Sequence, residues 1–151
     1  METHKIGILI KMASVEFEKD AATILKHYDL TPSQFKILRY VNHFKEKKIR
    51  QIDIEHTFNM SNPTVTGILQ NLEKKEYIKR LPNPEDKRSK VIILSQKLKD
   101  QKLNFERISQ EINNTFTKNL DSEQSQLLAD LLHELLDGRQ KCPIKGLNNS
   151  K

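Results

Sequence analysis

Residues 50–75 contain two segments with helical periodicity that are separated by a tight turn. The apolar residues of the second segment recur at the spacing of one helix face: Val65, Ile68, Leu69 and Leu72. Ser61 is a favourable N-cap for this helix, and Pro63 falls in its first turn, where a missing N–H costs no helical hydrogen bond. Ile54 and Phe58, four residues apart, give the first segment an apolar face that can pack on the second. The pattern predicts a helix-turn-helix.

A candidate β-hairpin follows the second helix. Residues 77–81 and 90–94 have the composition of short strands, and residues 82–88 between them contain two prolines, an asparagine and an aspartate, which favour a loop. A helix-turn-helix followed by such a hairpin is a winged helix. The expected fold class is therefore mainly α with a small β-hairpin wing. We also expect Ile49 to form a small extra strand that pairs with the wing.

With these elements in order, the sequence resembles the MarR family of bacterial transcription regulators. The wing segment at residues 86–95 reads DKRSKVIILS and fits the family's D-x-R-x5-L-[ST] pattern. The helix starts at residues 63–66 (PTVT) and 30–34 (LTPSQ) also look like the family's layout. The resemblance covers nearly the whole chain. It implies a winged helix-turn-helix over residues 31–95, inside one MarR-like domain over residues 1–138.

Long amphipathic segments flank the predicted winged helix. Residues 5–28 keep a helical step of apolar residues. After the wing, a second periodic stretch starts near Ser95 and predicts one long helix that ends around Asn119. Asp121 then opens a last helix with pairs of leucines, and Gly138 suits the position just past its end.

The flanking helices have two readings. Periodicity alone fits a core within one monomer as well as it fits a subunit interface. The resemblance favours the interface and implies a homodimer joined through residues 5–28 and 96–138. The last residues, 139–151, are expected to be a flexible tail.

The outward side of the predicted recognition helix is expected to contact DNA. Thr64 and Thr66 can hydrogen-bond to base edges or touch a thymine methyl, and the longer Asn and Gln side chains can pair with adenine. In a lone helix, such residues would more simply be caps; the wing that follows favours the DNA contact. The candidate DNA-binding residues of this motif are Gln51, Ser61, Asn62, Pro63, Thr64, Thr66 and Gln70.

Half of the chain's formal net charge of +6 lies on the predicted wing. Residues 79–90 hold five cations against two acids, a net charge of +3. The resemblance implies that Arg88 at the wing tip enters the DNA minor groove and that Asp86 orients it. The alternative is a solvated hairpin with no DNA contact, whose Asp–Arg pair would contribute only about 0–1 kcal/mol to stability. Candidates for phosphate contacts, which set affinity and salt dependence, are Arg80, Lys87 and Lys90.

Two residues depart from the family's pattern. The family usually has Gly where Glu76 stands, because the residue past a helix end often adopts a left-handed conformation that Gly tolerates best. Glu76 must bear that strain, or the helix must end differently. Arg50 replaces the Ser or Thr common before the first helix of the motif, which removes a cap and adds a cation near DNA.

Several other classes of function lack support in the sequence. There is no Gly-rich phosphate loop, H-E-x-x-H, C-x-x-C or G-x-S-x-G, so we expect neither catalysis nor a cofactor. The five histidines lack the spacing of a metal site, and Cys142 in the tail is expected to be a bystander thiol. No stretch approaches the roughly 20 apolar residues of a membrane span. We therefore expect a cytoplasmic protein with no membrane partner.

The resemblance implies a homodimeric repressor that binds a near-palindromic operator in double-stranded DNA. It also implies release by a small organic effector, in a pocket whose residues the sequence does not identify. Two alternatives stay open at this point. One is a zinc-responsive regulator of the same fold, and the other is a winged-helix protein-protein interaction module that does not read DNA.

Overall fold

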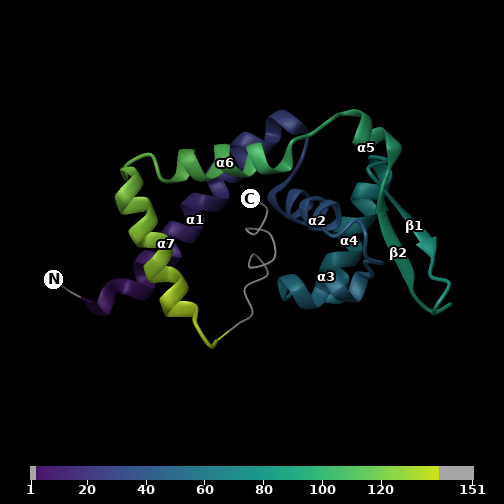
Figure 1. Cartoon of the computed structure of the whole chain (residues 1–151), viewed down its shortest axis with the longest axis horizontal. Helices are drawn as coiled ribbons and strands as arrows, with labels where there is room; N and C mark the ends of the chain where they lie inside the picture. The colour runs from purple at the N-terminus through teal and green to yellow at the C-terminus, as the bar shows by residue number, and fades with distance from the viewer. Residues whose placement is uncertain (1–2, 140–151) are drawn as a thin grey trace. The chain divides into compact units, whose positions relative to one another are not determined.

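The computed structural model describes residues 3–139, which divide into two compact units. The first unit holds residues 3–32 and 105–139, and the second holds residues 33–104. Helices make up most of the described chain, and the two strands within it form one hairpin (Figure 1). A mainly α fold with a small β-hairpin is confirmed. The single MarR-like domain stays a prediction, and the predicted tail lies almost wholly outside the described residues.

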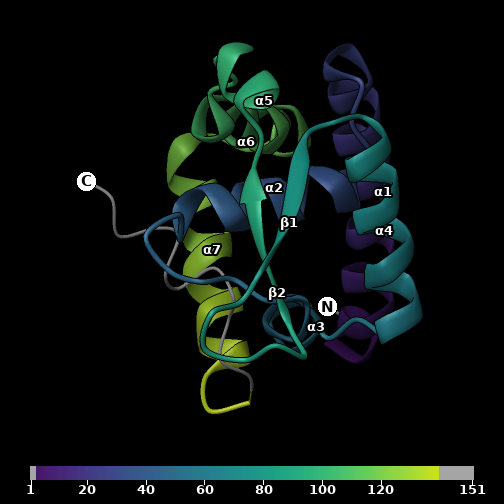
Figure 2. The same ribbon diagram turned by 90° about the vertical axis from the view of Figure 1, so that its right-hand side faces the viewer.

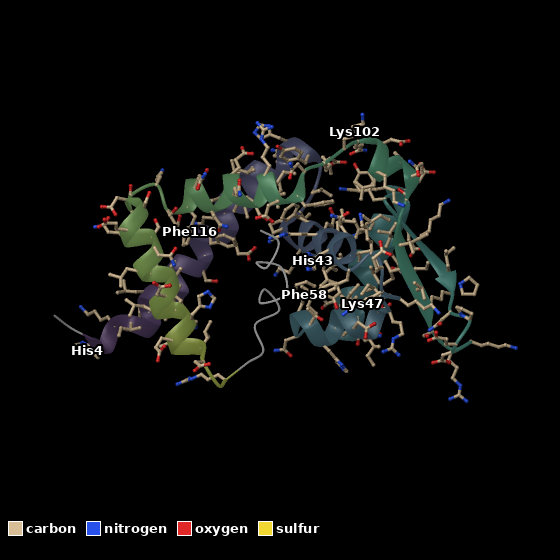
Figure 3. All side chains as sticks on the ribbon, viewed as in Figure 1. His4, His43, Lys47, Phe58, Lys102 and Phe116 are labelled. Carbon is tan, nitrogen blue, oxygen red and sulfur yellow. The ribbon has the colours of Figure 1, made fainter. Side chains whose placement is uncertain are left out.

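The first unit is built from helices. α1 and α6 pack together, and Phe17 meets Phe116 edge to face with ring centroids 5.3 Å apart (Figure 3 labels Phe116). The start of α7 is capped as its sequence predicts: Asp121 accepts from the Gln124 backbone N–H at 2.8 Å. Gly138 has a φ of 72° just past the last helix, also as predicted. The elements of this unit are η1 (Thr3–Lys5), α1 (Ile6–Leu25), η2 (Lys26–Tyr28), α6 (Phe105–Phe116) and α7 (Ser122–Leu136).

The second unit has the order of a winged helix. The apolar stripe expected on the second helix of the motif is present on α4, where three of its residues are buried and Ile68 is half-buried. Side chains from α2, α3, α4 and the hairpin form the core: Ile37, Leu38, Ile54, Val65, Leu69, Leu72 and Ile92. Apart from the first residue of α2, the unit contains α2 (Pro32–His43), α3 (Gln51–Phe58), α4 (Asn62–Lys74), β1 (Ile78–Pro82), β2 (Lys90–Leu94) and α5 (Gln96–Asp100).

The two apolar residues of α3 have different surroundings. Ile54 is fully buried, as its place in the pattern predicts. The pattern also directs Phe58 toward the next helix; in the structure its half-buried ring meets Tyr40 of α2, with centroids 5.5 Å apart (Figure 3 labels Phe58). The Thr57 hydroxyl donates to the Tyr40 hydroxyl at 3.3 Å. α3 is therefore attached to α2 as well as to α4.

β1 and β2 form an antiparallel hairpin whose register runs from Ile78 opposite Leu94 to Pro82 opposite Lys90 (Figure 2). The extra strand expected at Ile49 is reduced to a short contact with β2. The Ile92 N–H donates to the Ile49 carbonyl at 2.8 Å, and a single bridge joins the neighbouring residues of the two segments. This contact anchors β2 to the segment that leads into α3.

The single long helix expected from Ser95 to Asn119 is wrong. The structure has the short α5 and then α6, with a turn in which Lys102 adopts a left-handed φ of 51° (Figure 3). A left-handed residue cannot continue a right-handed helix. The sequence pattern hides the break because Leu98 and Phe105 are both buried and seven residues apart, a spacing that a continuous helix would also produce.

Candidate nucleic-acid interface

The start of α4 is exposed and polar. Ser61 caps the helix as predicted: its hydroxyl oxygen accepts from the Thr64 backbone N–H at 3.3 Å, and its O–H donates to the Thr64 hydroxyl at 2.8 Å. Pro63 lies in the first turn, where the missing N–H breaks no helical bond. Asn62 and Gln70 are also exposed. Four of the predicted contact residues, Ser61 to Thr64, are thus together on the exposed start of one helix, and Gln70 is exposed about two turns further along it.

Two further side-chain hydrogen bonds join α3 to α4. Gln51 donates from Nε2 to the Thr66 hydroxyl oxygen at 2.9 Å. One turn along each helix, Asn62 donates from Nδ2 to Oε2 of Glu55 at 3.2 Å. Gln51 and Thr66, both predicted DNA contacts, are half-buried and bonded to each other. Sequence reasoning missed Glu55, because its role depends on which residues the turn brings opposite one another.

The loop at the tip of the wing is ordered by side-chain hydrogen bonds. Asn83 is only 6% exposed; its amide donates to the Ser89 hydroxyl at 3.0 Å and accepts from the Glu85 backbone N–H at 3.1 Å. Asp86 accepts from the backbone N–H of Arg88 at 2.9 Å. This local pattern, an Asx-type turn, is what Asp and Asn side chains favour in loops.

Asp86 therefore acts on Arg88 through the backbone. Within residues 3–139, no ion pair joins the Asp86 carboxylate to the Arg88 guanidinium, so orientation of the side chain by direct pairing is not seen. Arg88 is exposed, and so are Lys87 beside it and Lys90 at the start of β2. The three cations are presented at the tip of the wing and on the strand just after it.

Arg80 has a different environment from the other wing cations. Its guanidinium contacts the Glu73 carboxylate through both Nε, at 2.8 Å, and Nη2. The Arg80 side chain is 24% exposed, which marks it as partly covered. The pair connects β1 to the last turns of α4. This geometry gives Arg80 a positioning role, and its proposed phosphate contact stays a prediction.

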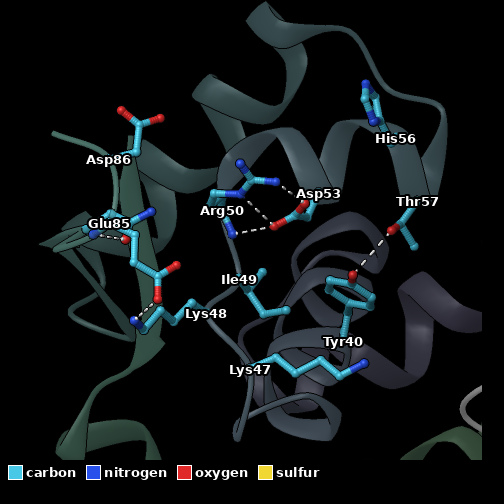
Figure 4. A pocket seen from close by; sticks show the side chains of 11 residues that line it. Tyr40, Lys47, Lys48, Ile49, Arg50, Asp53, His56, Thr57, Glu85 and Asp86 are labelled. Atoms are coloured by element: carbon cyan, nitrogen blue, oxygen red, sulfur yellow. Dashed lines mark hydrogen bonds and ion pairs between the residues drawn. The ribbon is translucent and has the colours of Figure 1, made fainter. Parts of the chain in front are cut away.

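The N-terminus of α3 is held by Arg50 and Asp53, which face an open cleft beside the wing loop (Figure 4). Asp53 accepts from the Arg50 backbone N–H at 2.8 Å and from the Arg50 guanidinium at 3.1 and 3.3 Å. Burial disfavours the charged carboxylate, but these bonds outweigh it and hold the pKa of Asp53 below its ordinary value. The acid three residues into the helix thus supplies one half of a capping box, because it accepts from the residue before the helix, while Arg50 itself offers no side-chain cap.

A second ion pair spans the same cleft. Lys48, in the loop before α3, lies 2.8 Å from the Glu85 carboxylate on the wing loop (Figure 4). The hydrogen bond from Lys48 lowers the pKa of Glu85. Both side chains are exposed, so the pair contributes little to stability. The sequence carried no signal for it, because the partners are 37 residues apart.

Glu76, just past the end of α4, adopts the left-handed conformation, with a φ of 59°. The Tyr77 N–H donates to the Leu72 carbonyl and the Glu76 N–H to the Glu73 carbonyl, which is a complete Schellman ending. Lys97 lies 3.3 Å from the Glu76 carboxylate. The wing therefore leaves α4 with the geometry that Gly normally provides.

The described part of the chain shows neither a metal site nor a membrane-spanning helix. Between residues 3 and 139, no group of three or more His, Cys, Asp or Glu side chains is arranged to hold a metal ion. The described helices include none that is long and apolar enough to cross a membrane. Cys142 lies outside the described residues.

The known proteins that this chain resembles agree with one another. The MarR family model matches residues 30–90. The HTH-type transcriptional regulator SarZ of Staphylococcus epidermidis is 30% identical over 132 residues, which cover 87% of this chain and 86% of SarZ. The crystal structure of a MepR–DNA complex from S. aureus aligns with a TM-score of 0.75 at 28% identity, over 89% of this chain and 97% of MepR.

A second solved structure agrees. The reduced form of MarR from E. coli aligns with a TM-score of 0.75 at 26% identity, covering 87% of this chain and 96% of that one. These likenesses extend well beyond the winged helix into the flanking helices. Together with the helix-turn-helix and wing described above, they show that the chain belongs to the MarR family of winged-helix transcription regulators.

Proposed function

We propose that this protein is a homodimeric repressor that binds a near-palindromic operator and is released by a small organic ligand. The observation that carries the DNA-binding part is the exposed, polar start of α4 in the same unit as a wing with four exposed cations: Lys79, Lys87, Arg88 and Lys90. The relatives support this reading, since MepR has been crystallised bound to DNA. SarZ, MepR and MarR are regulators, and we assign no catalytic role to this chain.

In the proposed complex, α4 enters the major groove by its N-terminal half. Asn62, Thr64 and Thr66 then face base edges, where side-chain amides and hydroxyls discriminate between base pairs. The positive end of the α4 dipole favours nearby phosphates. Arg88 enters the minor groove, and Lys87 and Lys90 neutralise backbone phosphates.

The homodimer is supported by apolar side chains that the described chain leaves exposed. α7 has no buried residue, although six leucines on it are between 38% and 58% exposed: Leu127, Leu128, Leu131, Leu132, Leu135 and Leu136. The first half of α1 is similar, with Ile6, Ile8, Leu9, Ile10, Met12 and Val15 exposed. Apolar surface of this extent is unusual on a monomer and is typical of an interface. A second copy of the chain supplies a matching surface.

Two-fold symmetry then follows for the complex. Each subunit contributes one winged helix, so the operator carries two half-sites in inverted orientation. A ligand can regulate such a dimer only by stabilising one spacing of the two α4 helices over the other. The ligand and its pocket rest on family membership alone. A cytoplasmic location belongs to the same proposal.

The test is fluorescence anisotropy of the full chain with DNA from its own upstream intergenic region and with a scrambled duplex, each at two salt concentrations. We expect preferential binding that weakens with salt and falls about 10-fold or more in Arg88→Ala, since loss of one groove-inserted Arg costs on the order of 1–3 kcal/mol. Arg139→Ala, in the first unit, is the matched control and is expected to bind normally.

Equal, weak affinity for every duplex, including fragments selected from the whole genome, would contradict the proposal. A protein-protein interaction module would then be the better account. Stoichiometric zinc after purification without added metal would instead point to the zinc-responsive alternative.

A further inference from the structure

Two successive hydrogen bonds between α3 and α4 form what we call the polar ladder: Gln51 donates to Thr66, and Asn62 donates to Glu55. Their lengths are 2.9 and 3.2 Å. Each helix contributes two residues one turn apart, so the rungs follow one another along the pair of helices. Three of the four residues are among those that the sequence predicts to contact DNA. The fourth, Glu55, is an acid on α3 that faces the exposed start of α4.

The chemistry of the Glu55 rung gives the Asn62 amide a direction. An ionised carboxylate only accepts hydrogen bonds, so the amide nitrogen of Asn62 must face it, as observed. A flipped amide would set its carbonyl oxygen against the carboxylate, with no proton between them. Oδ1 of Asn62 is therefore turned away from Glu55 as an acceptor, with the second N–H beside it.

The other rung acts on Thr66 in the same way. Gln51 donates to the hydroxyl oxygen, which leaves the Thr66 hydrogen available for an acceptor elsewhere. The ladder thus fixes an acceptor at Asn62 and a donor at Thr66, before any DNA is bound.

We propose that the polar ladder sets the base preference of α4, and that Glu55 is a specificity-determining positioning residue that acts through Asn62. In the major groove, adenine and cytosine present amino donors, whereas guanine and thymine present carbonyl acceptors. An Asn62 held with its oxygen outward selects adenine or cytosine at the base it reads. The inference rests on the proposed DNA-binding function.

The charge of Glu55 adds to this selectivity. A carboxylate close to the DNA surface opposes phosphate binding for every sequence alike, while the oriented amide favours one set of bases. Glu55 thereby lowers non-specific affinity more than specific affinity. Removing it is expected to tighten binding to a scrambled duplex and to weaken discrimination.

The experiment is selection of bound sequences from a randomised duplex library by the full-length protein. Asn62→Ala first identifies the base pair at which Asn62 reads, as the position where its preference disappears. Glu55→Ala is then expected to reduce the preference for adenine or cytosine at that same position from at least 10-fold to under twofold. Preferences at the other positions should stay. Glu46→Ala, which removes an acid from an exposed loop of the same unit, is the matched control and should change none.

Preserved preference at the Asn62 position in a Glu55→Ala protein that binds DNA would overturn the proposal. The proposal would also be overturned if Glu55→Ala weakened the base preferences equally at all positions and lowered the melting temperature of the protein. That result would mean that Glu55 only stabilises the fold. If circular dichroism shows that Glu55→Ala does not fold, Glu55→Gln replaces it. The Gln amide can present either its oxygen or its nitrogen to Asn62, so we expect a partial loss of the base preference at the Asn62 position. An unchanged base preference there would overturn the proposal. A wild-type protein that enriches no sequence would instead remove the proposed function itself.

Discussion

The two units of this protein differ in how completely they bury their own apolar residues. In the second unit, Val65, Leu69 and Leu72 of α4 are buried, and the exposed start of that helix is polar. In the first unit, α7 is an equally regular helix with a well-made N-cap, yet none of its residues is buried. The second unit therefore buries the apolar side of α4 and exposes hydrogen-bonding groups, whereas the first unit exposes the leucines of α7. A polar, cationic surface suits DNA, and an apolar one suits a protein partner.

The largest expected effect comes from a charge placed on the leucine face of α7. Leu131→Asp should weaken the dimer on the order of 100-fold, because two unpaired carboxylates would be buried at a cost of about 3 kcal/mol. Sedimentation velocity across a dilution series measures the change. His133→Asp, on the polar side of the same helix, introduces the same charge and should leave the dimer intact. A Leu131→Asp protein that stays dimeric would break the comparison between the two units.

Within the second unit, the cations of the wing have two kinds of surroundings: Lys87 is exposed, and Arg80 is paired with Glu73. Lys87→Ala should lower the slope of log affinity against log salt by about one, the value for one lost phosphate contact. Arg80→Ala should leave the slope unchanged but lower the free energy of unfolding by about 1 kcal/mol, because it leaves Glu73 without its partner. Equal slope changes in both variants would show that Arg80 leaves Glu73 to bind DNA.

The ending of α4 offers a smaller effect on stability. Glu76→Gly should raise the free energy of unfolding by about 1 kcal/mol, because Gly adopts the left-handed conformation without the penalty that a Cβ carries. Chemical denaturation measures it. Glu76→Ala removes the same carboxylate and keeps the strain, so it should give no gain. A stabilised Ala variant would mean that the charge, and not the backbone, is the source of the strain.

The smallest effect is a dependence on pH at the start of α3. Since the pKa of Asp53 is lower in the folded chain, its contribution to stability is present above its ordinary pKa, near 3.8, and is lost as the pH falls through the folded value. Asp53→Asn should therefore lower the free energy of unfolding by about 0.5–1 kcal/mol at pH 6, and the difference from the wild type should shrink as the pH falls below 3.8. Parallel curves over that range would argue against the Arg50–Asp53 cap.

Local patterns in the sequence predicted much of this structure. The stripe on α4, the Ser61 cap, the hairpin and the strain at Glu76 each depend on residues within a few positions of one another, where spacing and side-chain preference decide the conformation. The break after α5 was missed although it is local, because the apolar spacing across it equals a helical repeat. A four-residue connection with one left-handed residue, such as residues 101–104, leaves little trace in hydrophobic periodicity.

The candidate site was predicted less completely than the fold. Its residue types were found, but not their partners: Thr66 is bonded to Gln51, Arg80 to Glu73, and Asp86 to the backbone of its neighbour. Such pairs depend on where two elements cross, and the sequence specifies that only through the whole packed unit. An exposed cation and a paired one look alike in a sequence.

The central claim is that the second unit binds DNA while the leucine face of the first unit joins two chains. Native mass spectrometry of the protein with an operator fragment recovered by selection tests this claim most directly. Two chains on one duplex, and monomeric protein with greatly weakened DNA binding for Leu131→Asp, are the results predicted here. One chain on one duplex, bound as tightly by Leu131→Asp as by the wild type, would contradict the account, because the leucine face would then have no part in operator recognition.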